Sequence, residues 1–472
     1  MVKDHLDVVT LPWSAFGHML PFFQLSIALA KSGVHVSFVS TPRNIQRLPK
    51  IPPSLATLID LIEFPLPKLQ NGVLTEGAEA TVDISLDKVE YFKVAYDLLQ
   101  TPFKQFIAEQ LPDWIIVDFC AHWAVEIAQE YNVGLVLFTV MSAASSIFLG
   151  LPPRYVFLSD QKPAWPSLES LTKPPEWVNF PSSVAWREYE APFVHACLYT
   201  KDASGLSDAA RISKVLRACN ALAIRSCKEF EGEYLNLHEK MMGKPVISVG
   251  LLPRERNETS KITDGSWRKI FEWLDKQVPK SFVFVVFGSE CKLSREQVYE
   301  IAYGLELSLV PFLWALRKPF WAADEGDILP SGFSNRTFDR GMVCFGWAPQ
   351  MEILAHPSIG GSLFHSGWGS VIEILQFGHF LVVLPLVYDQ SLNASLLVDK
   401  GLAVEVERGQ DGSFDRDGIA KALRLAMVSD EGEAFRVRAR EAAVIFGDEN
   451  LHQQFYIGRF VEYLKHGLTK HE

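Results

Sequence analysis

The sequence lacks clusters of basic residues, and its acidic residues outnumber its basic ones. It has 45 Lys and Arg against 56 Asp and Glu, which gives a formal net charge of −11 over 472 residues. Proteins that bind the phosphate backbone of nucleic acids depend on concentrated positive charge. We therefore expect no nucleic-acid partner.

The sequence also lacks a long apolar segment. No stretch approaches the roughly 18 consecutive apolar residues of a membrane-spanning helix, so we expect no transmembrane segment. The first residues, MVKDHLDVVTLPW, carry Asp4, His5 and Asp7 where a signal peptide has its apolar core. These two features predict a soluble protein of the cytoplasm.

Paired cysteines and metal-ligand motifs are missing as well. The six cysteines are scattered without a Cys-x-x-Cys pair, so we expect them to be reduced and mostly buried. We find no convincing Asp-x-Asp motif and no His/Cys cluster with the spacing of a metal site. The turn after the first expected strand, LPWSAFGHM, contains only Gly17 and so lacks the Gly-x-Gly-x-x-Gly of NAD-dependent oxidoreductases. The sequence predicts no metal and no permanently bound cofactor.

What the sequence does contain is a regular alternation of strand and helix patterns. A chain of this length, with 48% hydrophobic and 21% charged residues, is globular and too long for one compact core. Helical patterns such as LPFFQLSIALAKSG (20–33) and AVEIAQEYN (124–132) separate short β-branched runs. This predicts an α/β doubly wound architecture of two Rossmann-like lobes, facing each other across a cleft at the carboxyl ends of their sheets. The expected strands cover residues 6–13, 34–40, 114–119 and 134–140, and then 281–289, 312–317, 342–347, 359–364 and 380–386.

Shifts in composition suggest the domain boundaries. We expect a first lobe at 1–249, a polar linker at 250–266 and a second lobe at 267–445, with a terminal helix at 446–472 that returns to the first lobe. The Pro- and Trp-rich segment 150–215 follows neither pattern, and we expect it to form a long excursion over the first lobe.

One stretch stands out, GGSLFHSGWGSVIEILQFG from Gly360 to Gly378. Small residues between its strand and its helix allow backbone N–H groups to approach a guest closely, and a helix N-terminus attracts an anion such as phosphate. The same residues also suit a tight strand-to-helix corner that binds nothing. The stretch by itself leaves both interpretations open.

The longer segment from Trp347 to Gln390 contains Trp-Ala-Pro-Gln at its start, His-x-Gly-Trp-x-Ser-x-x-Glu in its middle and Asp-Gln at its end. It resembles the 44-residue signature box of plant UDP-dependent glycosyltransferases. The stretches PWSAFGHMLPFFQLS and FVFVVFGSE extend the resemblance over the chain, while STPRNIQRLP, PDWIIVDFCAHWA and DGSFDRDGIAKAL resemble the branch that adds sugars to existing glycosides. The resemblance implies a GT-B fold whose first lobe binds the acceptor and whose second lobe binds a UDP-sugar.

The resemblance also implies which residues hold the donor. The start of the box would bind uracil and ribose, its middle the diphosphate, and its end the sugar. A Gln at the last position goes with glucose more often than with galactose, so we expect UDP-glucose. The implied residues are Ser289 beside the box; Trp347, Ala348, Gln350 and Glu373 for the nucleoside; His365, Gly367, Trp368, Gly369 and Ser370 for the diphosphate; and Asp389 and Gln390 for the sugar.

Three positions depart from the family pattern. The usual His-Cys-Gly-Trp-Asn-Ser is His-Ser-Gly-Trp-Gly-Ser here, so Ser366 replaces a Cys and Gly369 replaces an Asn. Phe380 stands where the family often has Pro. The Gly at 369 keeps its backbone N–H but loses a side-chain hydrogen bond, and we expect donor binding to be weaker or differently tuned.

Transfer of a sugar to a hydroxyl needs a base, and His has the side-chain pKa closest to neutrality. The resemblance places the catalytic base at His18, after the first strand, and a carboxylate that orients it at Asp118. The implied reaction is a single displacement with inversion at the anomeric carbon, without a metal.

The acceptor is less well defined by the sequence. Aromatic residues of the first lobe suit either an apolar pocket wall or core packing. Glu290, after the second lobe's first strand, suits either binding of acceptor-sugar hydroxyls or an exposed loop charge. The aromatic candidates are Trp13, Phe119, Trp123, Phe148 and Tyr155.

We thus expect a monomeric enzyme that moves glucose from UDP-glucose to a small natural-product glycoside, such as a terpenoid or flavonoid glycoside. One alternative uses UDP-rhamnose on similar acceptors. Another is a non-catalytic sugar-nucleotide binding protein, which the presence of both His18 and Asp118 disfavours.

Overall fold

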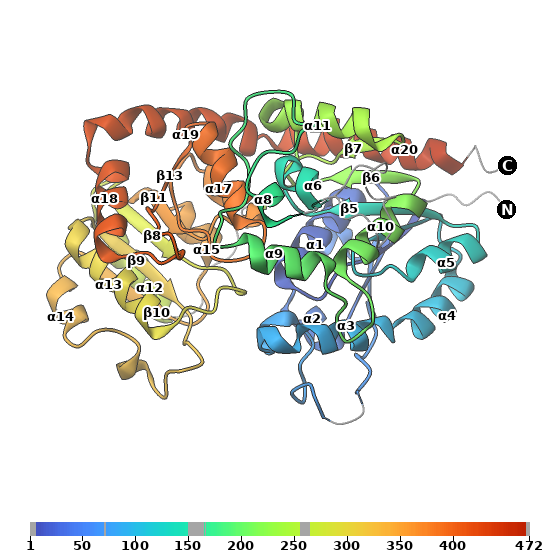
Figure 1. Cartoon of the computed structure of the whole chain (residues 1–472), viewed down its shortest axis with the longest axis horizontal. Helices are drawn as coiled ribbons and strands as arrows, with labels where there is room; N and C mark the ends of the chain where they lie inside the picture. The colour runs from blue at the N-terminus through green and yellow to red at the C-terminus, as the bar shows by residue number, and fades with distance from the viewer. Residues whose placement is uncertain (1–5, 70–71, 150–164, 166, 255–264, 469–472) are drawn as a thin grey trace. The chain divides into compact units, whose positions relative to one another are not determined.

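The chain folds into two compact units. The first comprises Met1–Pro181, Ala191–Leu252 and Glu449–Glu472, and the second comprises Ser182–Glu190 and Pro253–Asp448. The computed structural model describes residues 6–69, 72–149, 165, 167–254 and 265–468, and Figure 1 shows the chain coloured from its N-terminus to its C-terminus.

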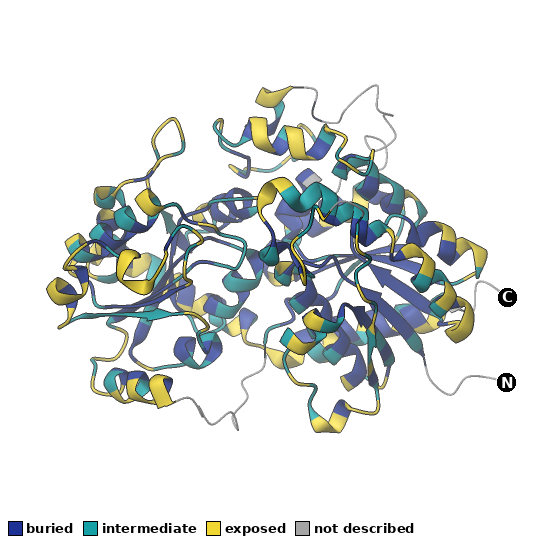
Figure 2. Cartoon of the chain, turned by 90° about the horizontal axis from the view of Figure 1, so that it is seen from below, coloured by how far each residue is buried: buried dark blue, intermediate teal, exposed yellow. Residues whose placement is uncertain are grey.

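The first unit is built on a parallel sheet. Among the described residues this sheet has seven strands, in the order β3-β2-β1-β4-β5-β6-β7. Central strands such as β4, with the sequence WIIV, are buried throughout, which is typical of parallel strands covered by helices on both faces. Figure 2 shows the strands mostly in dark blue and the exposed residues mainly on helices and loops. The strands are β1 (Asp7–Leu11), β2 (His35–Ser40), β3 (Ile59–Glu63), β4 (Trp114–Val117), β5 (Gly134–Thr139), β6 (Ala221–Ile224) and β7 (Val246–Ser248).

Helices follow most of these strands and shield the sheet. The longest is α1, which buries Phe22, Phe23 and Leu25 in the core of the unit. The helices are α1 (Phe16–Lys31), α2 (Pro42–Arg47), α3 (Val89–Asp97), α4 (Gln100–Gln110), α5 (Ala124–Glu130), α6 (Ala143–Leu149), α8 (Leu168–Leu171), α9 (Ala191–Tyr199), α10 (Asp208–Ala218), α11 (Lys228–Met242) and α20 (Gly458–Leu468).

The second unit repeats this plan. Its described residues form a parallel sheet of six strands in the order β10-β9-β8-β11-β12-β13. The strands are β8 (Phe282–Val286), β9 (Phe312–Leu316), β10 (Gly341–Phe345), β11 (Ile359–Phe364), β12 (Phe380–Val383) and β13 (Ala403–Glu405). The helices are α12 (Gly265–Leu274), α13 (Arg295–Ser308), α14 (Phe333–Thr337), α15 (Gln350–Leu354), α16 (Trp368–Leu375), α17 (Gln390–Asp399), α18 (Arg416–Met427) and α19 (Glu433–Phe446).

The two doubly wound lobes confirm the predicted fold class, and every predicted strand is present. Sequence patterns missed β3, β6, β7 and β13. Three of these lie at sheet edges, where strands are short and half-exposed and so lack an apolar run; β3, for example, reads IDLIE. The fourth, β6, is buried but only four residues long.

The segment 150–215 differs from its prediction. Residues 150–164 and 166 lie outside the described residues, but α9 and α10 show that much of the rest is helical rather than irregular. The hydroxyl of Ser207 caps α10 by accepting a hydrogen bond from the Ala210 N–H at 3.2 Å, a start signal that the prediction from sequence did not use. Residues Ser182–Glu190 belong to the second unit instead of covering the first. Of the expected linker, residues 255–264 lie outside the described residues, and α12 begins at Gly265.

The cysteines are free, as predicted, but fewer are buried than expected. Cys120, Cys219 and Cys227 are buried, whereas Cys291 and Cys344 are half-buried and Cys197 is exposed on α9. No helix in the described part of the chain is long and apolar enough to cross a membrane.

The C-terminal helix α20 completes the first unit, along which it runs at the red end of the colour scale in Figure 1. Phe460 and Leu464 are fully buried in the core of this unit. The Trp114 indole N–H donates to the Leu464 carbonyl at 2.9 Å, and a Cβ at Gly467 would lie only 2.5 Å from the Trp114 ring. The helix therefore approaches the sheet closely because a residue without a side chain faces the indole.

Each unit contains a buried histidine that resists protonation, which predicts acid sensitivity. Burial lowers the pKa of His238 to about 4 and that of His379 to about 3, from an ordinary value of 6.5. The unfolded chain therefore binds protons below pH 6.5 that the folded chain does not, so stability is full above pH 6.5 and falls as the pH falls through that value. The expected slope is about 1.4 kcal/mol per pH unit for each histidine.

His379→Leu tests this prediction, since both ring nitrogens of His379 are without a hydrogen-bond partner among the described residues. Urea unfolding at pH 7.5 and pH 5.5 should show that the variant loses about 1.4 kcal/mol less stability on acidification than the parent. An equal loss in both proteins would contradict the prediction.

Candidate active site

The first unit brings His18 and Asp118 together at the carboxyl edge of its sheet. Strands β1 and β4 pair in parallel with Leu11 opposite Val117, so the residues that follow both strands lie side by side. His18 is in the first turn of α1, and Asp118 directly follows β4. The His18 Nδ1 and the Asp118 Oδ2 are 2.7 Å apart.

The Asp118 carboxylate is held from three directions. Besides His18, it accepts hydrogen bonds from the Trp13 N–H at 3.1 Å and from the Phe119 N–H at 2.7 Å. Its side chain is 4% exposed, against 23% for His18. A carboxylate can only accept hydrogen bonds, so Nδ1 of His18 carries the hydrogen and Nε2 is the basic nitrogen of the neutral ring. This arrangement suits a general base oriented by an acid.

The aromatic acceptor candidates divide into two groups. Phe119 is half-buried, with its ring centroid 5.8 Å from that of His18, and the Trp13 ring lies 6.2 Å from Phe119. Trp123 is buried against Phe103, with a centroid distance of 5.5 Å. Phe148 is also buried and stacks on Trp165 at 5.2 Å. The structure thus brings the half-buried Phe119 near His18, while Trp13, buried against Phe92 and Tyr96, packs into the core like the other two. Tyr155 lies outside the described residues.

The predicted donor residues follow neighbouring strands of the second sheet. Ser289 and Glu290 come after β8, Trp347 after β10, His365 after β11, and Asp389 with Gln390 after β12. Because all these strands are parallel, the residues gather at one edge of the sheet. Ser289 and Glu290 are half-buried, and the roles predicted for them stay predictions.

His365 lies between two glycines at this edge of the sheet, Gly288 and Gly367. The Gly288 N–H donates to its Nδ1 at 3.2 Å, which leaves Nε2 as the ring nitrogen that carries hydrogen. A Cβ at Gly288 would lie 2.5 Å from Nε2, and one at Gly367 would lie 2.6 Å away. Burial, followed by the nearby charge of Arg317, lowers the His365 pKa to about 4, although a backbone hydrogen bond at Val286 acts in the opposite direction. The ring is therefore a neutral hydrogen-bond donor at neutral pH.

Helix α16 begins directly after His365. Its N-cap is Gly367, which provides no side-chain cap, so the first N–H groups of the helix are not capped by that residue. Gly369 and Ser370 are half-buried in the first turn, whereas the Trp368 side chain is only 3% exposed. Trp368 thus contributes its backbone to this edge and its indole to the core. A helix N-terminus of this kind attracts anions.

The nucleoside candidates lie beside this turn. Trp347 is 73% exposed, so its flat ring face is accessible, and the half-buried Ala348 follows it. The Gln350 amide donates to the Glu373 carboxylate at 2.6 Å, which joins the start of α15 to α16. These polar groups are close enough to bind adjacent hydroxyls.

The two residues predicted to bind the donor sugar, Asp389 and Gln390, form hydrogen bonds with residues close to them in the sequence. The Gln390 Oε1 accepts the N–H groups of Leu386 and Val387 at 2.9 and 3.0 Å, and its amide nitrogen lies 3.8 Å from the Cys291 sulfur. The Asp389 carboxylate accepts the Asn393 amide at 2.9 Å. Gln390 therefore fixes the shape of this turn with its carboxamide.

Ser366, one of the departures from the family pattern, joins the two turns. Its hydroxyl lies within hydrogen-bond distance of two carbonyls, that of His365 at 2.6 Å and that of Gln390 at 2.8 Å, and the Asn393 amide donates to the Ser366 carbonyl at 3.1 Å. The Ser366 backbone has a φ of 58°, which is uncommon outside glycine. Ser366 therefore joins the turn after β11 to the turn after β12.

Sequence reasoning missed two residues of this edge. Arg317 directly follows β9, which lies between the strands that lead to Gly288 and Trp347, and its charge acts on His365. Asn393 lies one helical turn after Asp389 and contacts both turns. Two signals in the sequence were available: an Arg at the carboxyl end of the run FLWALR, and the i, i+4 spacing of Asp389 and Asn393. Among the described residues no group of three His, Cys, Asp or Glu side chains is arranged to hold a metal.

The chain is similar to known proteins over nearly its whole length. The model of the family described as UDP-glucoronosyl and UDP-glucosyl transferase matches residues 267–431. The chain is 39% identical to UDP-glycosyltransferase 91C1 of Arabidopsis thaliana over 98% of its length and 97% of that protein. It is 40% identical to the soyasaponin III rhamnosyltransferase of Glycine max, covering 98% of this chain and 95% of that one.

Solved structures show the same fold. The Glycyrrhiza uralensis UGT73P12, in complex with glycyrrhetinic acid 3-O-monoglucuronide, superposes with a TM-score of 0.74 and 25% identity over 99% of this chain and 97% of that chain. With relatives of this identity over nearly its whole length, and with the signature box that its sequence carries, the chain belongs to the plant family-1 UDP-dependent glycosyltransferases.

Proposed function

We propose that this glycosyltransferase transfers glucose from UDP-glucose to a hydroxyl of a small natural-product glycoside, with inversion and without a metal. The observation that carries the proposal is the pairing of His18 with Asp118 at 2.7 Å. A sugar-nucleotide binding protein without activity has no use for a histidine oriented by a buried carboxylate.

In the proposed reaction Nε2 of His18 takes the proton of the acceptor hydroxyl as its oxygen attacks the anomeric carbon. The bond between that carbon and the UDP oxygen breaks, and UDP leaves from the opposite face. Asp118 stabilises the imidazolium that forms. On the donor, the His365 Nε2–H and the first N–H groups of α16 would stabilise the charge that develops on the diphosphate.

The remaining donor roles follow the same logic. We propose that Trp347 stacks on the uracil with Ala348 at its edge, that Gln350 and Glu373 bind the ribose, and that Asp389 binds sugar hydroxyls. The exposure of the Trp347 ring supports the first role. The acceptor would lie against Phe119, the half-buried aromatic candidate whose ring is near His18.

A specific observation favours a second donor. The soyasaponin III rhamnosyltransferase is among the relatives at 40% identity. UDP-rhamnose is therefore the second candidate, and both donors fit the same base and the same nucleotide residues. Release of UDP on mixing the protein with either UDP-sugar and a panel of glycosides tests the function as a whole, and no release with any pair would contradict it.

His18→Ala should lower turnover by about 10²- to 10⁴-fold, because it removes the base. UDP affinity, measured by calorimetry, should stay within about twofold, since the base acts on the acceptor. His35→Ala is the matched control: His35 also contacts carboxylates, those of Asp7 and Asp60 at 3.2 Å, but at the start of β2. Activity of His18→Ala within a few-fold of the parent would refute the role of His18.

Gly288→Ala should weaken UDP binding by about tenfold or more, because the new methyl group would displace the His365 ring and lose a hydrogen bond to a charged group. Uridine, which has no phosphate, should bind as it does to the parent. Gly265→Ala is the control within the same unit, since a Cβ there meets nothing within 4 Å. Equal loss of uridine and UDP affinity would mean that Gly288 does not act through the diphosphate.

The donor preference is tested by competition at equal donor concentrations. We expect kcat/KM for UDP-glucose to exceed that for UDP-rhamnose and UDP-galactose by about tenfold or more, because a site that binds hydroxyls rejects sugars that leave its groups unpaired. Gln390→Ala should reduce this preference more than it reduces UDP affinity, since it releases the turn that carries Asp389. A dominant rhamnosyl product would overturn the glucose assignment and leave the proposed base unaffected.

A further inference from the structure

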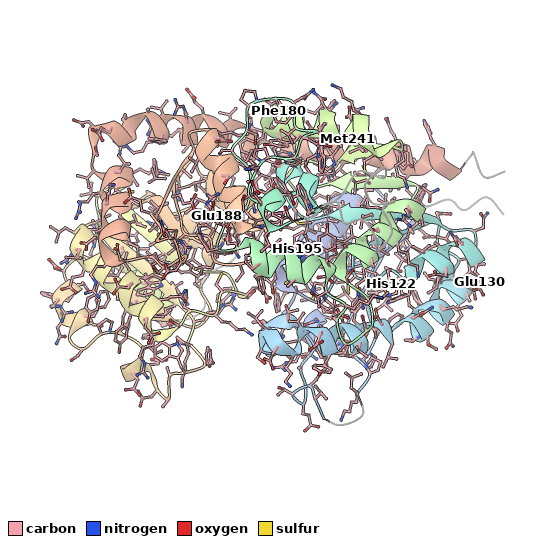
Figure 3. The ribbon with its side chains drawn as sticks, in the orientation of Figure 1. His122, Glu130, Phe180, Glu188, His195 and Met241 are labelled. Atoms are coloured by element: carbon pink, nitrogen blue, oxygen red, sulfur yellow. The ribbon has the colours of Figure 1, made fainter. Side chains whose placement is uncertain are left out.

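The segment Ser182–Glu190 belongs to the second unit, where it contacts helix α17. Near the end of α17, the Ser183 N–H and hydroxyl donate to the Asp399 carboxylate at 2.7 and 2.5 Å. In the middle, the Arg187 guanidinium donates to the Ser395 hydroxyl at 2.8 Å and pairs with Glu405 at 2.5 Å. In Figure 3, Glu188 is labelled within this segment.

The same segment holds the turn that leads into α17. The Trp186 indole N–H donates to the Tyr388 carbonyl at 3.2 Å, and Trp186 is only 3% exposed. Tyr388 has a φ of 58°, a left-handed conformation that is costly for a residue with a side chain. A buried indole that anchors the carbonyl of a strained residue fixes the backbone immediately before Asp389.

Glu190 holds the other side of this turn. Its carboxylate accepts a hydrogen bond from the Ser391 hydroxyl, two residues after Asp389. The second carboxylate oxygen accepts the Arg187 N–H at 2.9 Å, so Glu190 is itself held by the anchored Arg187. Trp186 and Glu190 thus contact the residues on both sides of the pair Asp389 and Gln390.

We propose that Trp186 and Glu190 are positioning residues that set the sugar-donor selectivity of the enzyme by fixing the turn from Tyr388 to Ser391. The inference rests on the proposed function, in which Asp389 binds the donor sugar. The nucleotide residues lie on other loops, after β8, β10 and β11, and the turn after β11 contacts this one through Ser366. Release of the turn from Tyr388 to Ser391 therefore changes sugar discrimination more than it changes UDP affinity.

The test compares Trp186→Phe and Glu190→Ala with the parent. Phe keeps an aromatic ring but has no N–H, and Ala removes the acceptor of the Ser391 hydroxyl. In each variant the ratio of kcat/KM for UDP-glucose to that for UDP-rhamnose should change by about threefold or more, the effect of one lost hydrogen bond. The affinity for UDP should stay within about twofold of the parent.

Two matched controls separate this role from general stability. Glu190→Gln keeps an acceptor for Ser391 and should restore the parental ratio. Ser183→Ala removes a contact of the same segment with the same helix, about 13 Å away along α17, and should leave the ratio unchanged.

The outcomes distinguish this inference from the function on which it rests. A changed ratio in Trp186→Phe and Glu190→Ala, together with parental ratios in both controls, supports it. If the parent enzyme transfers sugar and all the variants keep its ratio of kcat/KM for the two donors, the inference is overturned and the proposed function stands. The same holds if Ser183→Ala changes this ratio as much as Trp186→Phe and Glu190→Ala do. A parent that transfers sugar from neither donor overturns the proposed function and the inference with it.

Discussion

Parallel strand pairing is the constraint from which the rest of this structure follows. Parallel strands place all their carboxyl ends at one edge of a sheet, so the turns that leave those ends are neighbours even when they are far apart in sequence. In the first unit this brings His18 to Asp118, one hundred residues later. In the second unit it gathers the turns after β8, β9, β10, β11 and β12 into one row.

The neighbouring turns at this edge of the second sheet depend on glycines that allow a side chain to pack close to the backbone, and on residues with strained backbone conformations. Gly288 and Gly367 leave room for the His365 ring, which no other residue type would do at either position. Ser366 and Tyr388 both have left-handed φ values of 58°, and each is held by a side chain from elsewhere, Asn393 for the first and Trp186 for the second. Strain of this kind persists where surrounding contacts over-determine the backbone. Two of the seven left-handed non-glycine residues in the described part of the chain lie in the turns proposed to bind the diphosphate and the sugar.

Sequence patterns predicted most interior strands of both sheets because these strands are buried on both faces and form continuous apolar runs, as in FVFVV of β8. The interior strand β6 was missed because it is only four residues long, whereas the half-exposed edge strand β10 was predicted because its sequence, GMVCF, still contains an apolar run. The edge strands β3, β7 and β13 were missed because a half-exposed strand has no such run. The helices α9 and α10 were missed for a different reason: the Pro-rich residues before α9 suggested irregular chain, and the capping Ser207 that marks the start of α10 was not used. Arg317 was missed because a charged residue at a strand end is common and its neighbours become known only with the strand order.

The sequence by itself determined the two α/β lobes, the family and the identity of the residues assigned to the base and the nucleotide. These are local properties, carried by hydrophobic periodicity and by a contiguous signature from Trp347 to Gln390. Only the tertiary structure decided which aromatic residues lie near His18, that Gln390 uses its carboxamide to hold Leu386 and Val387, and that Ser182–Glu190 packs on α17. The first and the last depend on contacts between segments about one hundred or more residues apart, and the Gln390 contacts, although local, depend on the shape of the turn. Periodicity along the chain carries no information about either.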